Sequence, residues 1–204
     1  MSNPVSPARI AIIGHSSADL EGVAQALPEA FSVSVATSEQ LNYEFPEFSA
    51  VVLVMSAYEG APNSLIEAWE EISELLIPRA IVITKIENQE ADFDEAVLIA
   101  RRMFGEGLTP YLVLHADNGI PCAFIDLETL DIRDYSNGEL QIKSSDDDHR
   151  ILVSEFREEY LESVAELNEN RFASGLFVPI IPFSTTLKLG QNELVQYLNE
   201  VIES

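Results

Sequence analysis

The segment Arg9–Leu27 constrains the fold more than any other part of the chain. It opens with a continuous apolar run, Ile10–Ile13, which is typical of a strand buried on both faces. Gly14 follows as a turn residue, and we expect a helix from about Ser17 to Pro28. In nucleotide-binding α/β domains, backbone N–H groups of such a loop and helix start point at a phosphate. The segment therefore predicts an α/β domain with a phosphate-loop position at residues 14–21.

The residues of this loop depart from the phosphate-loop pattern G-x-x-x-x-G-K-[ST]. The eight positions are Gly14, His15, Ser16, Ser17, Ala18, Asp19, Leu20 and Glu21. Only the first glycine is retained, because Asp19 replaces the second glycine, Leu20 the lysine and Glu21 the hydroxyl residue. Leu20 supplies none of the charge-assisted hydrogen bonds that a lysine makes, each worth about 1.5–3 kcal/mol. A like-charge pair about 4 Å apart costs about 1 kcal/mol in water and about 4 kcal/mol near a protein surface, so both carboxylates oppose a triphosphate.

Strand and helix patterns alternate over the first half of the chain. Apolar runs predict strands at about 9–14, 50–55 and 79–85, and helical spacing predicts helices at 64–76 and 91–104. The run 31–36 alternates apolar and polar residues, as expected of a strand at a sheet edge. This alternation predicts a three-layer fold in which helices cover both faces of a mostly parallel sheet.

The pattern changes at Thr109. Short runs at 110–115, 121–127, 130–135 and 139–143 are separated by turn signals, and we expect the last three to form a small antiparallel meander. A long amphipathic helix is predicted at about 149–169, with an inner side made by Leu152, Phe156, Tyr160, Val164 and Leu167. A strand at 177–183 and a helix at 190–203 close the chain. We expect residues 1–8 to be disordered and residues 9–204 to form a single domain, with an insertion at about 109–170.

The charge of the chain limits its partners. The 204 residues include 35 Asp and Glu against 11 Lys and Arg, a net charge of −24. This excludes broad, direct binding to nucleic acid and to anionic membranes, and it favours either a solvated acidic surface or a basic protein partner. No apolar run has membrane-spanning length and no signal sequence opens the chain, so we expect a cytoplasmic protein. The single Cys122 excludes an internal disulfide, and no Cys/His cluster has metal-binding spacing.

Several segments together resemble the GTP-binding domain of elongation factor G, the translational GTPase that drives ribosomal translocation. They occur in the family's order: the opening strand, loop and helix at Arg9–Leu27, the strand and loop Val51–Gly60, the run Trp69–Phe104, the start of the inserted subdomain at Phe124–Leu127, and the closing stretch Pro179–Leu198. The resemblance implies a P-loop GTPase-like domain. Ser204 falls near the end of that family's G domain, so the chain is expected to be either an isolated or a free-standing domain.

The resemblance also places the family's functional positions. The guanine-reading N-K-x-D corresponds to Thr84, Lys85, Ile86 and Glu87, and the base-contacting S-A-[LK] loop to Ser184, Thr185 and Thr186. Lys85 could lie along a purine and Glu87 could accept the guanine N–H donors; the alternative is a strand end followed by a polar loop. No D-x-x-G lies between the first helix and Val51, where only the 22 residues Pro28–Ser49 stand in place of the long switch region.

These departures predict a degenerate, catalytically silent elongation factor G-like domain that acts as a protein- or ribosome-interaction module. We expect no resident cofactor or metal and GTP binding that is absent or weaker than millimolar. Two alternatives stay open. The first is a functional guanine-nucleotide-binding protein with altered motifs, which would take GTP or GDP with Mg²⁺. The second is a Rossmann-like enzyme, which the missing G-x-G-x-x-G disfavours.

Overall fold

The computed structural model describes residues 7–40, 44–105, 107–167 and 170–203. The main sheet is parallel and has the strand order β2-β1-β3-β4-β9. Its strands are β1 (Ala8–Gly14), β2 (Phe31–Thr37), β3 (Ala50–Ser56), β4 (Arg79–Thr84) and β9 (Ile180–Pro182). The predicted α/β fold with a mostly parallel sheet is therefore confirmed, and β2 lies at the sheet edge as its alternating sequence predicted.

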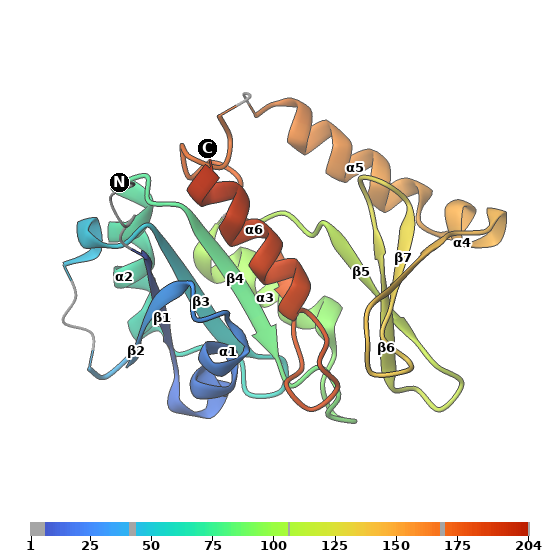
Figure 1. The fold of residues 1–204 in the computed structure, drawn as a ribbon, viewed down its shortest axis with the longest axis horizontal. Helices are drawn as coiled ribbons and strands as arrows, with labels where there is room; N and C mark the ends of the chain where they lie inside the picture. The colour runs from blue at the N-terminus through green and yellow to red at the C-terminus, as the bar shows by residue number, and fades with distance from the viewer. Residues whose placement is uncertain (1–6, 41–43, 106, 168–169, 204) are drawn as a thin grey trace, which may run out of the picture.

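Helices cover both faces of this sheet, which gives three layers (Figure 1). The helices are α1 (Leu20–Ala26), α2 (Ser64–Glu74), α3 (Phe93–Phe104) and α6 (Gln191–Glu203). Side chains of α2 and α3 pack with one set of alternate strand residues, including Leu53 and Ile81. Side chains of α1 and α6 pack with the opposite set, including Val52 and Val82. All seven residues of β3 are buried, because a central parallel strand has covered neighbours on each face.

A second, antiparallel sheet follows α3 and contains one strand more than the sequence predicted. Its strand order is β5-β6-β7-β8, comprising Tyr111–His115, Pro121–Asp126, Asp131–Asp134 and Gln141–Ser144. We expected a meander of only the last three. The first strand belongs to it because β5 pairs antiparallel with β6 across the turn at residues 116–120. The sheet lies beside the β9 end of the main sheet, where Leu108 and Pro179 form a bridge (Figure 1).

The predicted long helix at 149–169 is wrong in its continuity, and its predicted inner face is confirmed for Tyr160, Val164 and Leu167 but wrong for Leu152 and Phe156. The structure has α4 (Asp147–Leu152) and α5 (Ser154–Ala165), interrupted at Val153, while residues 168–169 lie outside the described ranges. The break places Val153, Tyr160 and Val164 in the core and leaves Leu152 70% and Phe156 55% exposed. Asp146 begins α4 because its side chain accepts the backbone N–H of His149.

One smaller expectation also changes. Ala8, assigned to a disordered start at residues 1–8, is the first residue of β1, whereas residues 1–6 lie outside the described ranges. The single cysteine, Cys122, is half-buried. None of the helices in the described part of the chain is long and apolar enough to cross a bilayer.

The same Leu→Ala substitution should change the free energy of unfolding by different amounts at a buried and at an exposed helix position. Leu65 on α2 is fully buried, and Leu65→Ala should lower the free energy of unfolding by about 2–5 kcal/mol through lost burial and a residual cavity. Leu98 on α3 is 66% exposed, and the matched control Leu98→Ala should change it by about 0.5 kcal/mol or less. Urea unfolding of both variants checks this; equal costs would contradict the described packing.

Candidate functional site

Four loops meet at the carboxyl edge of the parallel sheet, one after each of β1, β3, β4 and β9. Thr84, the last residue of β4, connects the loop after β1 with the end of β3. Its hydroxyl is positioned to donate to the carbonyl oxygens of Ala18 at 2.8 Å and Met55 at 3.2 Å, and the residue is only 1% exposed. The strand end of the predicted base site therefore lies directly against the predicted phosphate loop.

The phosphate-loop position is held by contacts within the loop. The backbone N–H of Ser17 donates to His15 Nδ1 at 3.2 Å, and that of Ala18 donates to the His15 carbonyl at 2.9 Å. Residues Ser16–Ala18 form a 3₁₀ turn, and α1 begins only at Leu20, so the helix expected from Ser17 is wrong at its start. The His15 side chain explains the difference, because it caps this turn and ends the strand–turn segment before the helix begins.

Asp19 links this loop to the loop that follows β9. Its backbone is left-handed, with φ 58° and ψ 45°, a conformation that the glycine of the phosphate-loop pattern adopts freely and that Asp tolerates. Its carboxylate accepts a hydrogen bond from the Thr185 hydroxyl at 2.8 Å. A Cβ atom on Gly22 would lie 2.4 Å from this carboxylate, so the acid packs tightly against the first turn of α1.

The side chain of Leu20 is buried in the core and does not face solvent at the loop. The residue is 4% exposed and belongs to the core on the α1 and α6 side of the sheet. A Cβ atom on Gly14 would lie 2.7 Å from Leu20 Cδ2 and 2.3 Å from the Val54 carbonyl oxygen, so only glycine fits at residue 14. The residue that replaces the phosphate-loop lysine is thus a core side chain. Glu21 is exposed in the first turn of α1.

Glu59, in the loop after β3, is a site residue that the sequence analysis did not single out. A hydrogen bond with Ser17 and then the neighbouring Lys85 lower the pKa of its carboxyl group. Lys85 Nζ lies 3.2 Å from Glu59 Oε2, and Lys85 itself has a left-handed backbone with φ 60°. The available sequence signal was its position: it follows a buried parallel strand, at the edge where loops converge.

The remaining base-site residues differ in burial and in their hydrogen-bond partners. Glu87 Oε2 is buried without a hydrogen-bond partner among the described residues. Ser184 is 1% exposed, and its hydroxyl accepts the backbone N–H of Leu187 at 3.1 Å. Thr185 and Thr186 are exposed, and the Thr185 hydroxyl is occupied by Asp19. The structure therefore gathers the predicted phosphate and base positions but joins them through the chain's own side chains.

The electrostatic environment of the loop is acidic. Besides Asp19, Glu21 and Glu59, Glu39 approaches the loop with its Oε1 3.7 Å from His15 Nε2. Lys85 is already paired with Glu59. The described residues also contain no group of three or more His, Cys, Asp or Glu side chains placed to hold a metal ion.

Sequence comparison with known proteins relates most of this chain to part of a larger protein. No family model matches the chain. It is 25% identical over 169 residues to the Elongation factor G-like protein of Mycobacterium tuberculosis strain CDC 1551 / Oshkosh, and equally to that of strain H37Rv. The match covers 71% of this chain and 23% of each relative, so the chain spans about a quarter of their length.

A crystal structure of a protein from Thermus thermophilus has the same fold. Its TM-score is 0.74 at 19% identity, over 95% of this chain and 40% of the other. This likeness supports the α/β fold with its parallel main sheet and small antiparallel sheet. Part of the chain is also similar in sequence to the elongation factor G-like proteins.

Thr84 provides a direct test of the contact that joins the loop after β1 to the ends of β3 and β4. Thr84→Val removes the buried hydroxyl and leaves two carbonyl oxygens without that donor, so the free energy of unfolding should fall by about 1–3 kcal/mol. Thr84→Ser keeps the hydroxyl and should recover at least half of that loss. Chemical denaturation of the two variants checks this, and a Thr84→Val protein as stable as the parent would contradict the described hydrogen bonds.

The contact between Asp19 and Thr185 predicts an energetic coupling. In a double-mutant cycle of Asp19→Gly and Thr185→Val, the coupling in the free energy of unfolding should be about 0.5–1.5 kcal/mol. Gly22→Ala is a second measure, because its Cβ would displace the Asp19 carboxylate and destabilise the native protein. A cycle in which the two substitutions are additive would show that the carboxylate and hydroxyl do not interact in solution.

Proposed function

We propose that the chain is a degenerate elongation factor G-like GTP-binding domain that does not hydrolyse GTP and acts as a protein-interaction module in the cytoplasm. The observation that supports this most strongly is the hydrogen bond between Asp19 and Thr185. It joins the residue at the second phosphate-loop glycine to the loop that contacts the base in the family. The nucleotide position is thus bridged by the protein itself.

A nucleotide would have to displace several internal contacts and enter an acidic site. The Asp19–Thr185 hydrogen bond and the Glu59 contacts with Ser17 and Lys85 would have to open. The phosphates would then face carboxylates at about 1–4 kcal/mol for each pair at 4 Å. Because Leu20 is a core side chain, it offers no compensating charge. These terms favour binding weaker than millimolar.

Hydrolysis is opposed by further features. Phosphoryl transfer to water requires an oriented water molecule, Mg²⁺ and contacts from switch segments. Glu21 stands where the family's metal-binding hydroxyl would be, and the segment Pro28–Ser49 is short. Within its described part, this segment forms the edge strand β2 and a 3₁₀ turn at Phe45–Glu47, whose residue Phe45 is buried in the core. The described part of this segment is therefore built into the sheet and the core.

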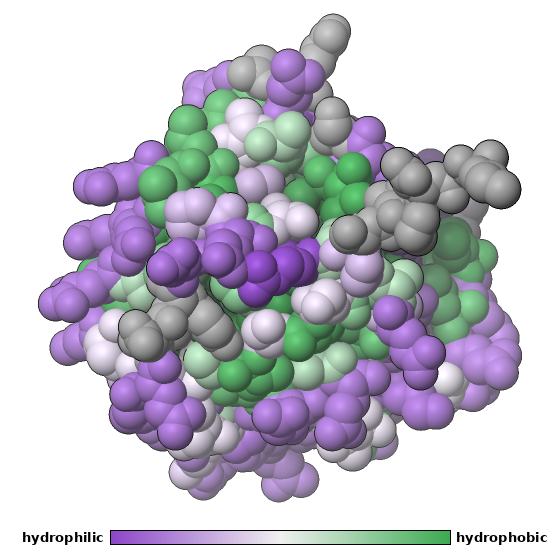
Figure 2. All heavy atoms as spheres, turned by 60° about the vertical axis from the view of Figure 1, so that its left-hand side comes forward, coloured by the Kyte–Doolittle hydropathy of each residue, from purple (hydrophilic) through white to green (hydrophobic). Residues whose placement is uncertain are grey.

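The interaction role rests on exposed apolar side chains around α4, α5 and α3. Ile151, Leu152 and Phe156 are 72%, 70% and 55% exposed, and Phe156 and Leu98 line a groove of about 330 Å³ between α5 and α3. Asp94, Glu159 and Arg101 border this groove, and Arg101 Nη1 lies 3.7 Å from Glu159 Oε1, which leaves Asp94 as the acid not paired with Arg101. Hydrophobic patches between hydrophilic residues also occur on the face that Figure 2 shows. In a chain of net charge −24, the occupant that fits is a protein segment with an apolar face bordered by Lys or Arg.

One observation favours the competing function, a guanine-nucleotide-binding protein with altered motifs. Glu87 stands at the position of the guanine-reading carboxylate, and its Oε2 has no hydrogen-bond partner among the described residues. A guanine base presents N–H donors that could satisfy this oxygen. Nucleotide titration separates the two functions.

Isothermal titration with GTP and GDP, each with and without Mg²⁺, should give no saturable heat up to roughly millimolar ligand. We expect this because Asp19 already bonds to Thr185 and because carboxylates surround the loop at residues 14–21. One-to-one binding with a micromolar dissociation constant would overturn the proposal. In that case Glu87→Gln should weaken binding, and an exposed-site control such as Glu139→Gln should not.

The interaction role is tested separately by placing a photo-crosslinking amino acid at Phe156. A crosslink to one basic protein, lost when Ile151 and Leu152 are both replaced by Ser, supports a docking face on α4 and α5. The same crosslinker at Tyr58, which is 51% exposed elsewhere, is the control. Equal crosslinking from both positions would contradict the role, and co-sedimentation with ribosomes shows whether the partner is ribosomal.

A further inference from the structure

A second candidate site lies away from the phosphate-loop position, between the two sheets. A cavity of about 370 Å³ opens between α6, the chain before β9, the antiparallel sheet and α5. Its walls combine aromatic rings with charged groups, and it contains none of residues 14–21 or 84–87. No local sequence pattern marks this cavity, because its residues come from segments far apart in the chain.

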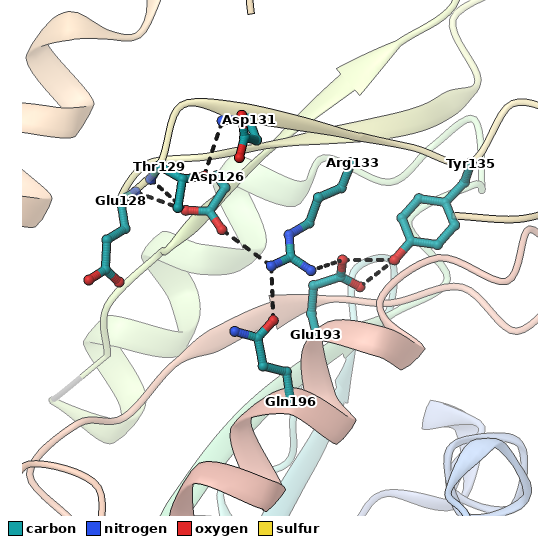
Figure 3. Close-up of polar contacts among 8 residues, drawn as sticks. All are labelled: Asp126, Glu128, Thr129, Asp131, Arg133, Tyr135, Glu193 and Gln196. Atoms are coloured by element: carbon teal, nitrogen blue, oxygen red, sulfur yellow. Dashed lines mark hydrogen bonds and ion pairs between the residues drawn. The ribbon is translucent and has the colours of Figure 1, made fainter. Parts of the chain in front are cut away.

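The central charge of this cavity, Arg133 on β7, is already held by acids. Its guanidinium lies 3.4 Å from Glu193 Oε1 and 3.5 Å from Asp126 Oδ2, and it donates to Gln196 Oε1 at 2.9 Å. Figure 3 shows the guanidinium between these groups, with the Tyr135 hydroxyl against the carboxylate of Glu193. An anionic ligand would have to compete with two carboxylates for Arg133.

The remaining charges make the cavity net negative. The second guanidinium, Arg171, lies 3.7 Å from Glu128 Oε1 and stacks over the rings of Phe172 and Phe177. The lining carboxylates Asp126, Glu128, Glu193 and Glu200 number four against two guanidinium groups, which gives 2 − 4 = −2. Burial raises the pKa of Glu193, and with that one group protonated the sum is still −1. The lining therefore favours a cation.

Two tyrosine hydroxyls of the cavity lining are without partners. Tyr111 is 8% exposed and Tyr160 5% exposed, and both line the cavity. Neither hydroxyl has a hydrogen-bond partner among the described residues, whereas Tyr135 and Tyr197 have theirs. The rings are buried, but neither hydroxyl oxygen is among the fully buried atoms that lack a partner, so both are accessible and a ligand with donors in the cavity could bond to them.

We propose that this cavity binds a small organic cation, an alkylammonium or alkylguanidinium compound. Its N–H groups would donate to the hydroxyls of Tyr111 and Tyr160 and to Asp126 Oδ2, which is shared with Arg133, because Asp126 Oδ1 already accepts the backbone N–H groups of Glu128 and Thr129. Its alkyl stem would bury apolar area against the aromatic rings that line the cavity. This proposal does not depend on the proposed function, because it concerns another site and another ligand.

Isothermal titration with agmatine and putrescine tests the proposal on the full chain. We expect saturable one-to-one binding of at least one of them and no binding of 1,4-butanediol, which has a similar length and no charge. Tyr111→Phe and Tyr160→Phe remove only the unpartnered hydroxyl, so both proteins should fold, and each should bind about 3- to 10-fold more weakly. Tyr58→Phe, at a 51% exposed residue outside the cavity, should leave the affinity unchanged.

Three outcomes would overturn the proposal. The first is no saturable heat with either amine up to roughly 10 mM. The second is amine binding that neither tyrosine substitution weakens, which would show general attraction to the acidic surface. The third is preferential binding of inorganic phosphate, which would show that Arg133 and Arg171 define the site. Melting curves of the variants establish that each result refers to folded protein.

Discussion

The parallel sheet must be buried on both faces, and the rest of the structure depends on this constraint. Apolar residues on successive positions of β3 and β4 point to opposite sides, so each face needs its own helices. The pairs α2 and α3 on one face and α1 and α6 on the other supply them. The crossovers then place the loops after β1, β3, β4 and β9 together at one edge.

The same edge explains how side chains of this chain can fill the predicted nucleotide position. Once the loops converge, a carboxylate on one of them lies within reach of donors on another. Asp19 reaches Thr185, and Glu59 reaches Ser17 and Lys85. These carboxylates satisfy donors that a phosphate or a base would otherwise meet. These internal contacts are the physical basis for proposing a binding module and not an enzyme.

Local signals predicted most of the fold, and contacts between distant segments account for what they missed. The buried runs of β1, β3 and β4 follow from hydrophobic pattern alone. The break at Val153 and the pairing of β5 do not, because both depend on packing against the rest of the domain. At the site, the replaced motif residues were visible in the sequence. The role of Glu59 and the 166-residue separation between Asp19 and Thr185 could be seen only in three dimensions.

The central claim is that internal side chains occupy the nucleotide position. It is tested most directly by amide chemical shifts in ¹⁵N-labelled protein titrated with Mg·GDP to roughly 10 mM. The account predicts that the amides of residues 14–21, 84–87 and 184–186 stay within the small, linear changes seen over the rest of the surface. Saturable shifts confined to these three segments would show that the loops open to nucleotide and would contradict it.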